Sequence, residues 1–160
     1  MLALGTVISS ASCSGPILDY KGGRIDALGG GASGVPEVDI SADEYFDTMA
    51  KTGFNEEQAI QFLVCGHSIG SVHHSGFPEV QDDRFVSPTN TNGGCPFSSL
   101  GPNHFNNQMA VDYVAGHSQN PLVTSYNETN RADLRIYESD GNATIREYVL
   151  SRVRLARAPC

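Results

Sequence analysis

Apolar residues recur at helical spacing in several stretches of this 160-residue chain. The first stretch, residues 2–8, predicts a short apolar helix that ends before Gly15-Pro16. A second helix is predicted over residues 41–51, where Ser41 and Glu44 have the three-residue spacing of a capping box. Both helices are short, as expected for a chain rich in glycine and proline.

A third helix is predicted over residues 55–67. Asn55 and Gln58 again have the spacing of a capping box. The residues that follow place four side chains at positions i, i+3, i+4 and i+7, which are Ile60, Leu63, Val64 and His67. A histidine is therefore expected on the apolar face of a helix.

The remaining elements are predicted to be helices separated by long loops. Residues 103–115 predict one helix, and Thr144 and Glu147 predict the cap of a last helix. Its apolar face would carry Ile145, Tyr148, Val149 and Val153. Residues 15–39 and 76–103 are rich in Gly, Pro, Asn and Ser and predict loops. The fold class is thus mainly α, with little strand.

Charge and cysteine content narrow the classes of function. The formal net charge is −8, which argues against a nucleic-acid partner, because binding phosphate requires clustered Lys and Arg. The four cysteines, Cys13, Cys65, Cys95 and Cys160, lack C-x-x-C spacing, so a zinc ribbon is not expected. They allow three disulfide pairings, and spacing alone does not choose among them.

The cellular compartment is indicated by weaker signals. Two glycosylation acceptor motifs, at Asn127 and Asn142, together with an even number of cysteines favour a secretory origin. The N-terminal apolar run is too short to cross a membrane. It also lacks the basic region of a signal peptide, since the first charged residue is Asp19. We expect no signal peptide here and no association with a membrane.

The stretch GHSIG at residues 66–70 permits three kinds of site. It fits the G-x-S-x-G pattern of a serine hydrolase with Ser68 as nucleophile, but the preceding residues predict a helix where that site needs a strand. A zinc site would require Cys65 and His67 to share a helix face, which their spacing opposes. The third kind is a single axial ligand, because an imidazole between Gly66 and Gly70 is accessible to a flat group such as haem.

The third interpretation gains support from a family resemblance. Residues 57–70 resemble the proximal helix of the plant, fungal and bacterial haem peroxidases, in which a small residue precedes the haem-ligating histidine. Five further segments resemble motifs of that family in the same order, namely CSGP at 13–16, GRIDA at 23–27, GVPE at 34–37, FNN at 105–107 and ADLRIY at 132–137. The nearest resemblance is to secreted peroxidases of ascomycete fungi.

The resemblance implies roles for individual residues. His67 would be the proximal ligand of haem b, and Asp133 would accept a hydrogen bond from its Nδ1–H. Ser68 falls on a ligand of the proximal cation site of many relatives. Asn106 stands where those relatives have an aspartate, and a neutral amide is a weaker ligand for a hard cation, which argues against calcium. The other histidines match no motif.

One part of the family pattern is absent. The R-x-x-[FW]-H motif, whose histidine takes a proton from peroxide, does not occur in this sequence, and no histidine precedes His67. We therefore expect residues 1–160 to be the proximal half of a haem-peroxidase-like helical domain, with Met1 an internal start. The isolated chain would then be weakly stable and would turn over poorly.

The implied function is a haem peroxidase that uses H2O2 to oxidise a small reductant by one-electron steps. This chain would supply the haem-ligating half, with no catalytic Arg or His of its own. The first alternative is a non-catalytic haem-binding remnant. The second is a serine hydrolase that uses Ser68.

Overall fold

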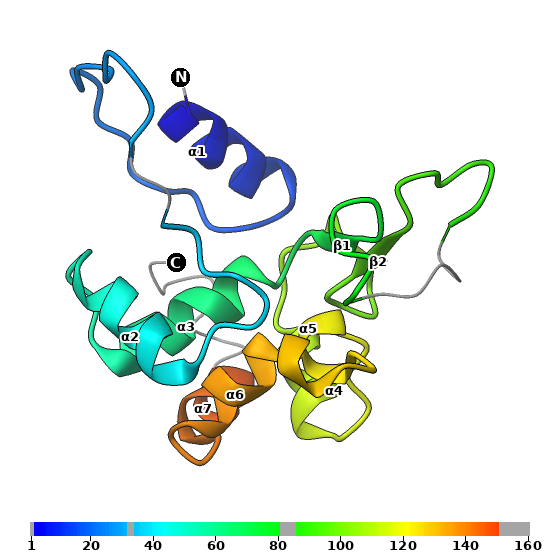
Figure 1. Ribbon diagram of the computed structural model, residues 1–160. Coiled ribbons are helices and arrows are strands. Elements are labelled where there is room, and N and C mark those ends of the chain that lie inside the picture. The colour runs from blue at the N-terminus through cyan, green and yellow to red at the C-terminus, as the bar shows by residue number, and fades with distance from the viewer. Residues whose placement is uncertain (1, 32–33, 81–85, 151–160) are drawn as a thin grey trace.

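The computed structural model describes residues 2–31, 34–80 and 86–150. These residues form short helices and one small two-stranded sheet (Figure 1). The helices are α1 (Leu2–Ser12), α2 (Ala42–Ala50), α3 (Glu56–Gly66), α4 (Gln108–Val114), α5 (Pro121–Thr124), α6 (Ala132–Glu138) and α7 (Ala143–Leu150). The strands are β1 (Ser71–His73) and β2 (Gly94–Pro96), and Glu128–Asn130 forms a single 3-10 turn, η2. The expected class, mainly α with long loops, is confirmed.

Both predicted capping boxes are present. The Ser41 hydroxyl accepts from the Glu44 backbone N–H at the start of α2, and the Glu44 carboxylate accepts in return from the Ser41 backbone N–H. Asn55 and Gln58 make the same reciprocal pair at the start of α3. Each box satisfies backbone donors that the first helical turn leaves unpaired.

Two other helices do not begin as the sequence predicted. The helix expected from residue 103 starts only at Gln108, because the Asn106 side chain accepts from the Gln108 backbone N–H at 2.7 Å and forms a turn there.

The predicted cap of α7 by Thr144 and Glu147 is wrong, since Thr144 lies inside the helix. Asp140 performs that role instead, accepting from the backbone N–H groups of Ala143 and Thr144 at 3.0 and 2.9 Å. Val153, expected on the apolar face of α7, lies outside the described residues.

The hydrophobic core is built around α3. Its inner face carries Ala59, Ile60 and Val64, each at most 1% exposed. This face packs against α2, α6 and α7, and Figure 1 shows α3 lying among these helices. The Tyr45 hydroxyl joins α2 to α3 by donating to the Ala59 carbonyl at 2.9 Å. Because α3 is held on several sides, its C-terminal end is a fixed point from which a side chain can be presented.

The small sheet continues directly from that end of α3. β1 and β2 pair antiparallel, with Val72 opposite Cys95. The turn between α3 and β1 contains Gly70 at φ +92°, a conformation that favours glycine. The Gly70 carbonyl accepts from the Phe97 backbone N–H at 3.3 Å. This link brings the residue that follows β2 beside the end of α3.

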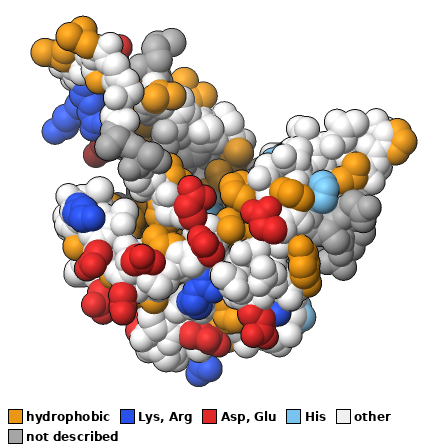
Figure 2. Space-filling model, in the orientation of Figure 1, with side chains coloured by type: hydrophobic (Ala, Val, Ile, Leu, Met, Phe, Trp, Pro, Cys, Tyr) orange, Lys and Arg blue, Asp and Glu red, His pale blue; other side chains and the backbone are white. Residues whose placement is uncertain are grey.

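The N-terminal segment stands apart from this core. Figure 1 shows α1 and the loop after it above the other helices, and the Cys13 carbonyl accepts from the Phe105 backbone N–H at 2.9 Å. Several large apolar side chains of this segment are strongly exposed, as the upper part of Figure 2 shows, and they include Leu2, Ile17, Ile25, Leu28 and Val35. No helix among the described residues is long and apolar enough to cross a membrane.

The cysteines differ in their state. Cys65, at the buried end of α3, is disulfide-bonded. Cys13 is a free thiol of intermediate exposure. The Cys95 thiol lies 3.8 Å from the Pro96 carbonyl and 3.9 Å from that of Gln119. Cys160 lies outside the described residues.

Candidate functional site

His67 lies at the C-terminal end of α3. The helix ends at Gly66, so His67 is its C-cap and lies one residue beyond the predicted helical position. Its backbone N–H still donates to the Leu63 carbonyl at 2.9 Å, which continues the helical hydrogen-bond pattern. The side chain is 24% exposed. The core thus fixes the backbone of His67 while one edge of its ring remains accessible.

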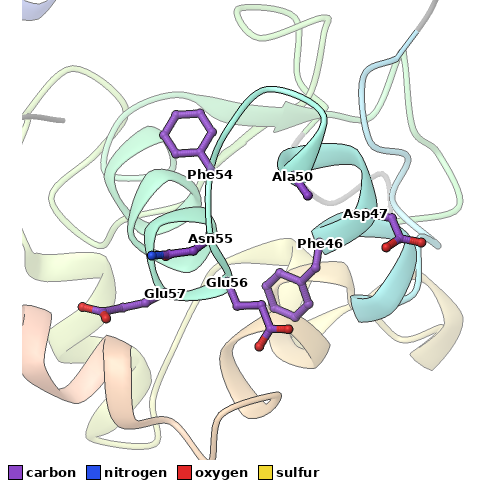
Figure 3. Close-up of a pocket in the computed structure, with 7 residues that line it drawn as sticks. All are labelled: Phe46, Asp47, Ala50, Phe54, Asn55, Glu56 and Glu57. Carbon is purple, nitrogen blue, oxygen red and sulfur yellow. The ribbon is translucent and has the colours of Figure 1, made fainter.

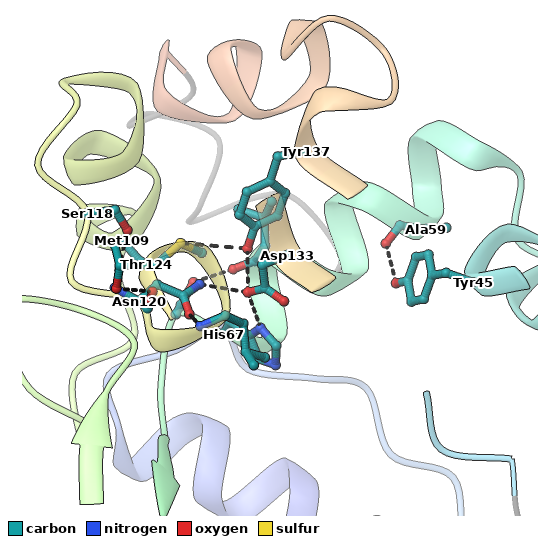
Figure 4. Close-up of polar contacts among 12 residues, drawn as sticks. Tyr45, Ala59, His67, Met109, Ser118, Asn120, Thr124, Asp133 and Tyr137 are labelled. Carbon is teal, nitrogen blue, oxygen red and sulfur yellow. Dashed lines mark hydrogen bonds and ion pairs between the residues drawn. The ribbon is translucent and has the colours of Figure 1, made fainter. Parts of the chain in front are cut away.

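The structure pairs His67 with Asp133. Nδ1 of His67 lies 2.7 Å from Oδ2 of Asp133, although the two residues are 66 positions apart in the sequence (Figure 4). Asp133 is in the first turn of α6, and its side chain is 1% exposed. A carboxylate can only accept, so the proton of this bond is on Nδ1 of His67. In the neutral ring, the lone pair is then on Nε2.

Two further donors share the same carboxylate oxygen. The Asn120 amide donates to Oδ2 of Asp133 at 2.6 Å, and the Tyr137 hydroxyl donates to it at 3.1 Å (Figure 4). Burial, and to a lesser extent the charge of Asp133, raise the pKa of Tyr137 well above its usual value. Tyr137 therefore remains protonated and acts as a donor at ordinary pH.

Neither donor was predicted from the sequence, although the sequence contains a signal for each. Asn120 is followed by a proline, a combination typical of the start of a helix. Tyr137 is four residues after Asp133 and so lies on the same face of a helix. Either signal becomes informative only once Asp133 is known to be a buried acceptor.

Phe97 is a further residue of the site that was not predicted from the sequence. Its ring stacks on the imidazole of His67 with a centroid distance of 4.0 Å and an interplanar angle of 14°. Phe97 is 8% exposed and belongs to the hydrophobic core. It supports one face of the His67 ring, while Asp133 holds the edge that carries Nδ1.

The opposite edge of the ring carries Nε2, which makes no hydrogen bond within the described residues. At the neighbouring Gly66, an added Cβ would meet no atom within 4 Å, so the space beside this turn is open. An imidazole with Nδ1 held and Nε2 accessible is a suitable axial ligand for a metal in a flat macrocycle. The residues present at this site therefore fit haem.

Ser68 and Asn106 are both occupied by local hydrogen bonds. Ser68 is 1% exposed, and its hydroxyl donates to the Val64 carbonyl at 3.0 Å. The Asn106 amide donates to the His104 carbonyl at 2.9 Å, and its oxygen accepts from Gln108. Within the described ranges, no group of three or more His, Cys, Asp or Glu side chains is arranged to hold a metal ion. The possible cation site at Ser68 and Asn106 stays a prediction.

The hydrolase interpretation lacks its structural context. A nucleophile elbow follows a strand, whereas Ser68 follows the helix α3 and its hydroxyl is buried. A serine hydrolase also needs an acid and a histidine after the serine, and Asp112 and His117 occur in that order. These two residues contact each other at the end of α4, where Nε2 of His117 lies 3.5 Å from Oδ1 of Asp112. The same observations exclude Ser68 as an exposed nucleophile.

A groove of about 510 Å³ lies elsewhere, between α2 and the start of α3 (Figure 3). Phe46 and Phe54 form its apolar part, and Asp47, Glu56 and Glu57 lie along its rim. These carboxylates are exposed, and Figure 2 shows acidic side chains spread over much of this face of the protein. The groove follows from the packing of two helices and does not include His67.

Comparison with known proteins supports the family resemblance. A sequence profile for the family described as peroxidase matches residues 1–148. The chain is also 34% identical over 148 residues to a "WSC domain-containing protein" of Arthroderma benhamiae. That alignment covers 91% of this chain but 20% of the relative, so the chain spans about a fifth of the relative's length.

The arrangement around Asp133 predicts a strong effect of its removal. Asp133→Ala removes the shared acceptor of two buried donors, Asn120 and Tyr137, and of the partly exposed His67. We expect the free energy of unfolding to fall by about 3 kcal/mol or more. Chemical denaturation of the protein without haem measures this change.

Asp112→Ala is the control, because Asp112 is also buried, at 3% exposed, but its Oδ2 has no hydrogen-bond partner and its Oδ1 contacts only Gln108 and the exposed His117 among the described residues. Equal losses in the two variants would contradict the role given to Asp133.

Proposed function

The chain belongs to the peroxidase family, and we propose that it binds haem b with His67 as the axial ligand of the iron. The observation that carries this proposal is the bond between Nδ1 of His67 and the buried carboxylate of Asp133, 2.7 Å long. It leaves Nε2 as the only ring nitrogen able to bind a metal. Haem, when bound, would supply the redox chemistry for H2O2-dependent one-electron oxidation of small reductants.

In this proposal the residues behind His67 act through its electronic state. Asp133 accepts a hydrogen bond from Nδ1–H and gives the ring partial imidazolate character, which makes Nε2 a stronger electron donor. A stronger donor favours the ferric over the ferrous state. Phe97, stacked at 4.0 Å, keeps the ring plane from rotating about its bond to the chain.

The proposal assigns iron ligation to this chain and no step in breaking the O–O bond of peroxide. That step requires a group that accepts a proton from peroxide, and none of the residues that surround Asp133 is placed in that role. We therefore expect turnover by this chain alone to stay near that of free haem. The chain spans about a fifth of the relative's length, and we propose that it serves as the haem-ligating part of a longer protein.

A non-catalytic haem-binding role is the second candidate. It is favoured by the absence of the R-x-x-[FW]-H motif from the sequence. Both candidates share the ligand His67, and both predict little turnover by this chain alone. Turnover of the longer protein therefore separates them, and haem binding does not.

We also propose that the protein passes through the secretory pathway. Cys65 is disulfide-bonded, and disulfides form and persist mainly in oxidising compartments. The two acceptor motifs for N-glycans, at Asn127 and Asn142, agree with this compartment.

Substitution of the ligand tests the proposed function. Hemin added to the chain should produce an absorption spectrum of a histidine-ligated ferric haem, and His67→Ala should abolish it because the axial bond is lost. Titration of each protein with hemin, followed by absorption spectroscopy, measures both affinity and ligation.

The matched control is His104→Ala, since His104 is exposed and its ring has no contact with Asp133. That variant should retain the spectrum of the unaltered protein. An unchanged spectrum in His67→Ala would exclude the ligand assignment.

A further inference from the structure

We propose that Asn120 and Tyr137 form a clamp on Asp133 that fixes its carboxylate and limits the strength of its bond to His67. This inference rests on the proposed function for its consequence at haem. The effect of the two donors on the bond between Asp133 and His67 is a property of the protein without haem.

The clamp places three donors on one oxygen atom. Oδ2 of Asp133 receives hydrogen bonds of 2.6 Å from Asn120, 2.7 Å from His67 and 3.1 Å from Tyr137. Asn120 and Tyr137 are completely buried, and Asp133 is 1% exposed. Each donor stabilises part of the negative charge of the carboxylate, so less of that charge remains to attract the Nδ1 proton.

Asn120 is held rigidly in this role. Its oxygen accepts from the Leu122 backbone N–H at 2.9 Å at the start of α5. A backbone N–H can only donate and a carboxylate can only accept, so the orientation of the amide is determined at both ends. The backbone carbonyl of Asn120 also accepts from the Thr124 hydroxyl at 3.0 Å. The donor to Asp133 therefore cannot rotate away without disrupting α5.

Tyr137 completes the clamp from the helix that carries Asp133 itself. Its single hydroxyl proton has two acceptors within reach, Oδ2 of Asp133 at 3.1 Å and the Met109 sulfur at 3.8 Å. A thioether is a weak acceptor, so the proton is directed to the carboxylate. Burial keeps the pKa of Tyr137 well above its usual value, which preserves this donor.

Removal of a clamp donor should strengthen the bond between His67 and Asp133. The remaining charge on Oδ2 would then attract the Nδ1 proton more strongly. In the protein without haem, the Nδ1–H resonance of His67 should move downfield. In the haem-loaded protein, the added electron density at Nε2 should lower the reduction potential.

The test compares Tyr137→Phe with Tyr113→Phe in ¹⁵N-histidine-labelled protein without haem. Tyr113 is the matched control, because its hydroxyl donates to Asn142 at 2.6 Å and does not contact Asp133. We expect the Nδ1–H resonance to move downfield in Tyr137→Phe and to stay in place in Tyr113→Phe. An unchanged or upfield resonance in Tyr137→Phe would overturn the proposal.

A second variant covers the case in which Tyr137→Phe does not fold. Asn120→Ser keeps an oxygen that can cap α5 but removes the amide donor to Asp133. The same downfield shift is expected, and an unchanged resonance there also overturns the clamp. If the resonance shifts but no hemin binds, the clamp stands and the proposed function fails. If hemin binds through His67 but the resonance does not move, the proposed function stands and the clamp fails.

We infer separately that Asn127, and not Asn142, carries an N-glycan when the chain passes through the secretory pathway. In this reaction the Asn127 side-chain nitrogen attacks the anomeric carbon of a lipid-diphosphate-linked oligosaccharide. The new C–N bond forms as the C–O bond to the diphosphate breaks. One amide proton is lost to solvent, and the lipid diphosphate leaves.

The two acceptor motifs differ in accessibility. Asn127 and Thr129 are both exposed, in the segment that leads into η2. The oxygen of Asn127 accepts from the Thr129 backbone N–H at 3.0 Å, and its amide nitrogen makes no hydrogen bond within the described residues. The reactive nitrogen of Asn127 is therefore directed to solvent.

The Asn142 motif is held within the fold. Asn142 has φ +66° in the turn before α7, and its oxygen accepts from the Tyr113 hydroxyl at 2.6 Å. Thr144, which supplies the hydroxyl of the motif, is 7% exposed and donates to the Asp140 carboxylate. In the folded chain the hydroxyl of this motif is therefore engaged by Asp140 and inaccessible.

Expression of the full chain behind a secretory leader in a eukaryotic host tests this assignment. N-glycosidase treatment converts a glycan-bearing Asn to Asp, which peptide mass spectrometry locates. We expect conversion at Asn127 alone, with loss of the glycan in Asn127→Gln and its retention in Asn142→Gln. A glycan on Asn142, or none on Asn127, would overturn the assignment.

Discussion

The hydrogen bond between His67 and Asp133 is the interaction on which the rest of the site depends. At 2.7 Å, with Asp133 1% exposed, it fixes which imidazole nitrogen carries the proton and which remains accessible. A buried carboxylate is costly unless its charge is compensated by donors. The fold meets this requirement with Asn120 and Tyr137, so the donors around Asp133 follow from burying its charge as much as from any role in function.

The surrounding fold serves to hold the two ends of this bond in place. α3 is fixed by contacts with α2, α6 and α7, and it presents His67 at its C-terminal end. α6 carries Asp133 in its first turn and packs on the same core. The short sheet between them brings Phe97 against the imidazole ring. Three separate segments thus meet at one side chain, although each of them is short and none would be stable alone.

Local patterns in the sequence predicted those elements whose signals are local. The capping boxes at Ser41 and Asn55 were correct because both partners lie within one helical turn. The same spacing misled at Thr144, where Asp140 supplies a better acceptor just before α7. Asp133 was found through family resemblance, since spacing does not indicate a partner 66 residues away. Asn120 and Phe97 were missed because their roles arise only when distant segments meet.

The central claim is that His67 bonds a haem iron through Nε2 with Asp133 behind it. Resonance Raman spectroscopy of the ferrous, haem-loaded chain tests this most directly through the iron–imidazole stretching band. The account predicts that the band is present and that it falls in frequency in Asp133→Asn, because a neutral amide accepts a weaker hydrogen bond from Nδ1–H. A band that is absent from the unaltered chain, or that is unmoved by the substitution, would contradict the account.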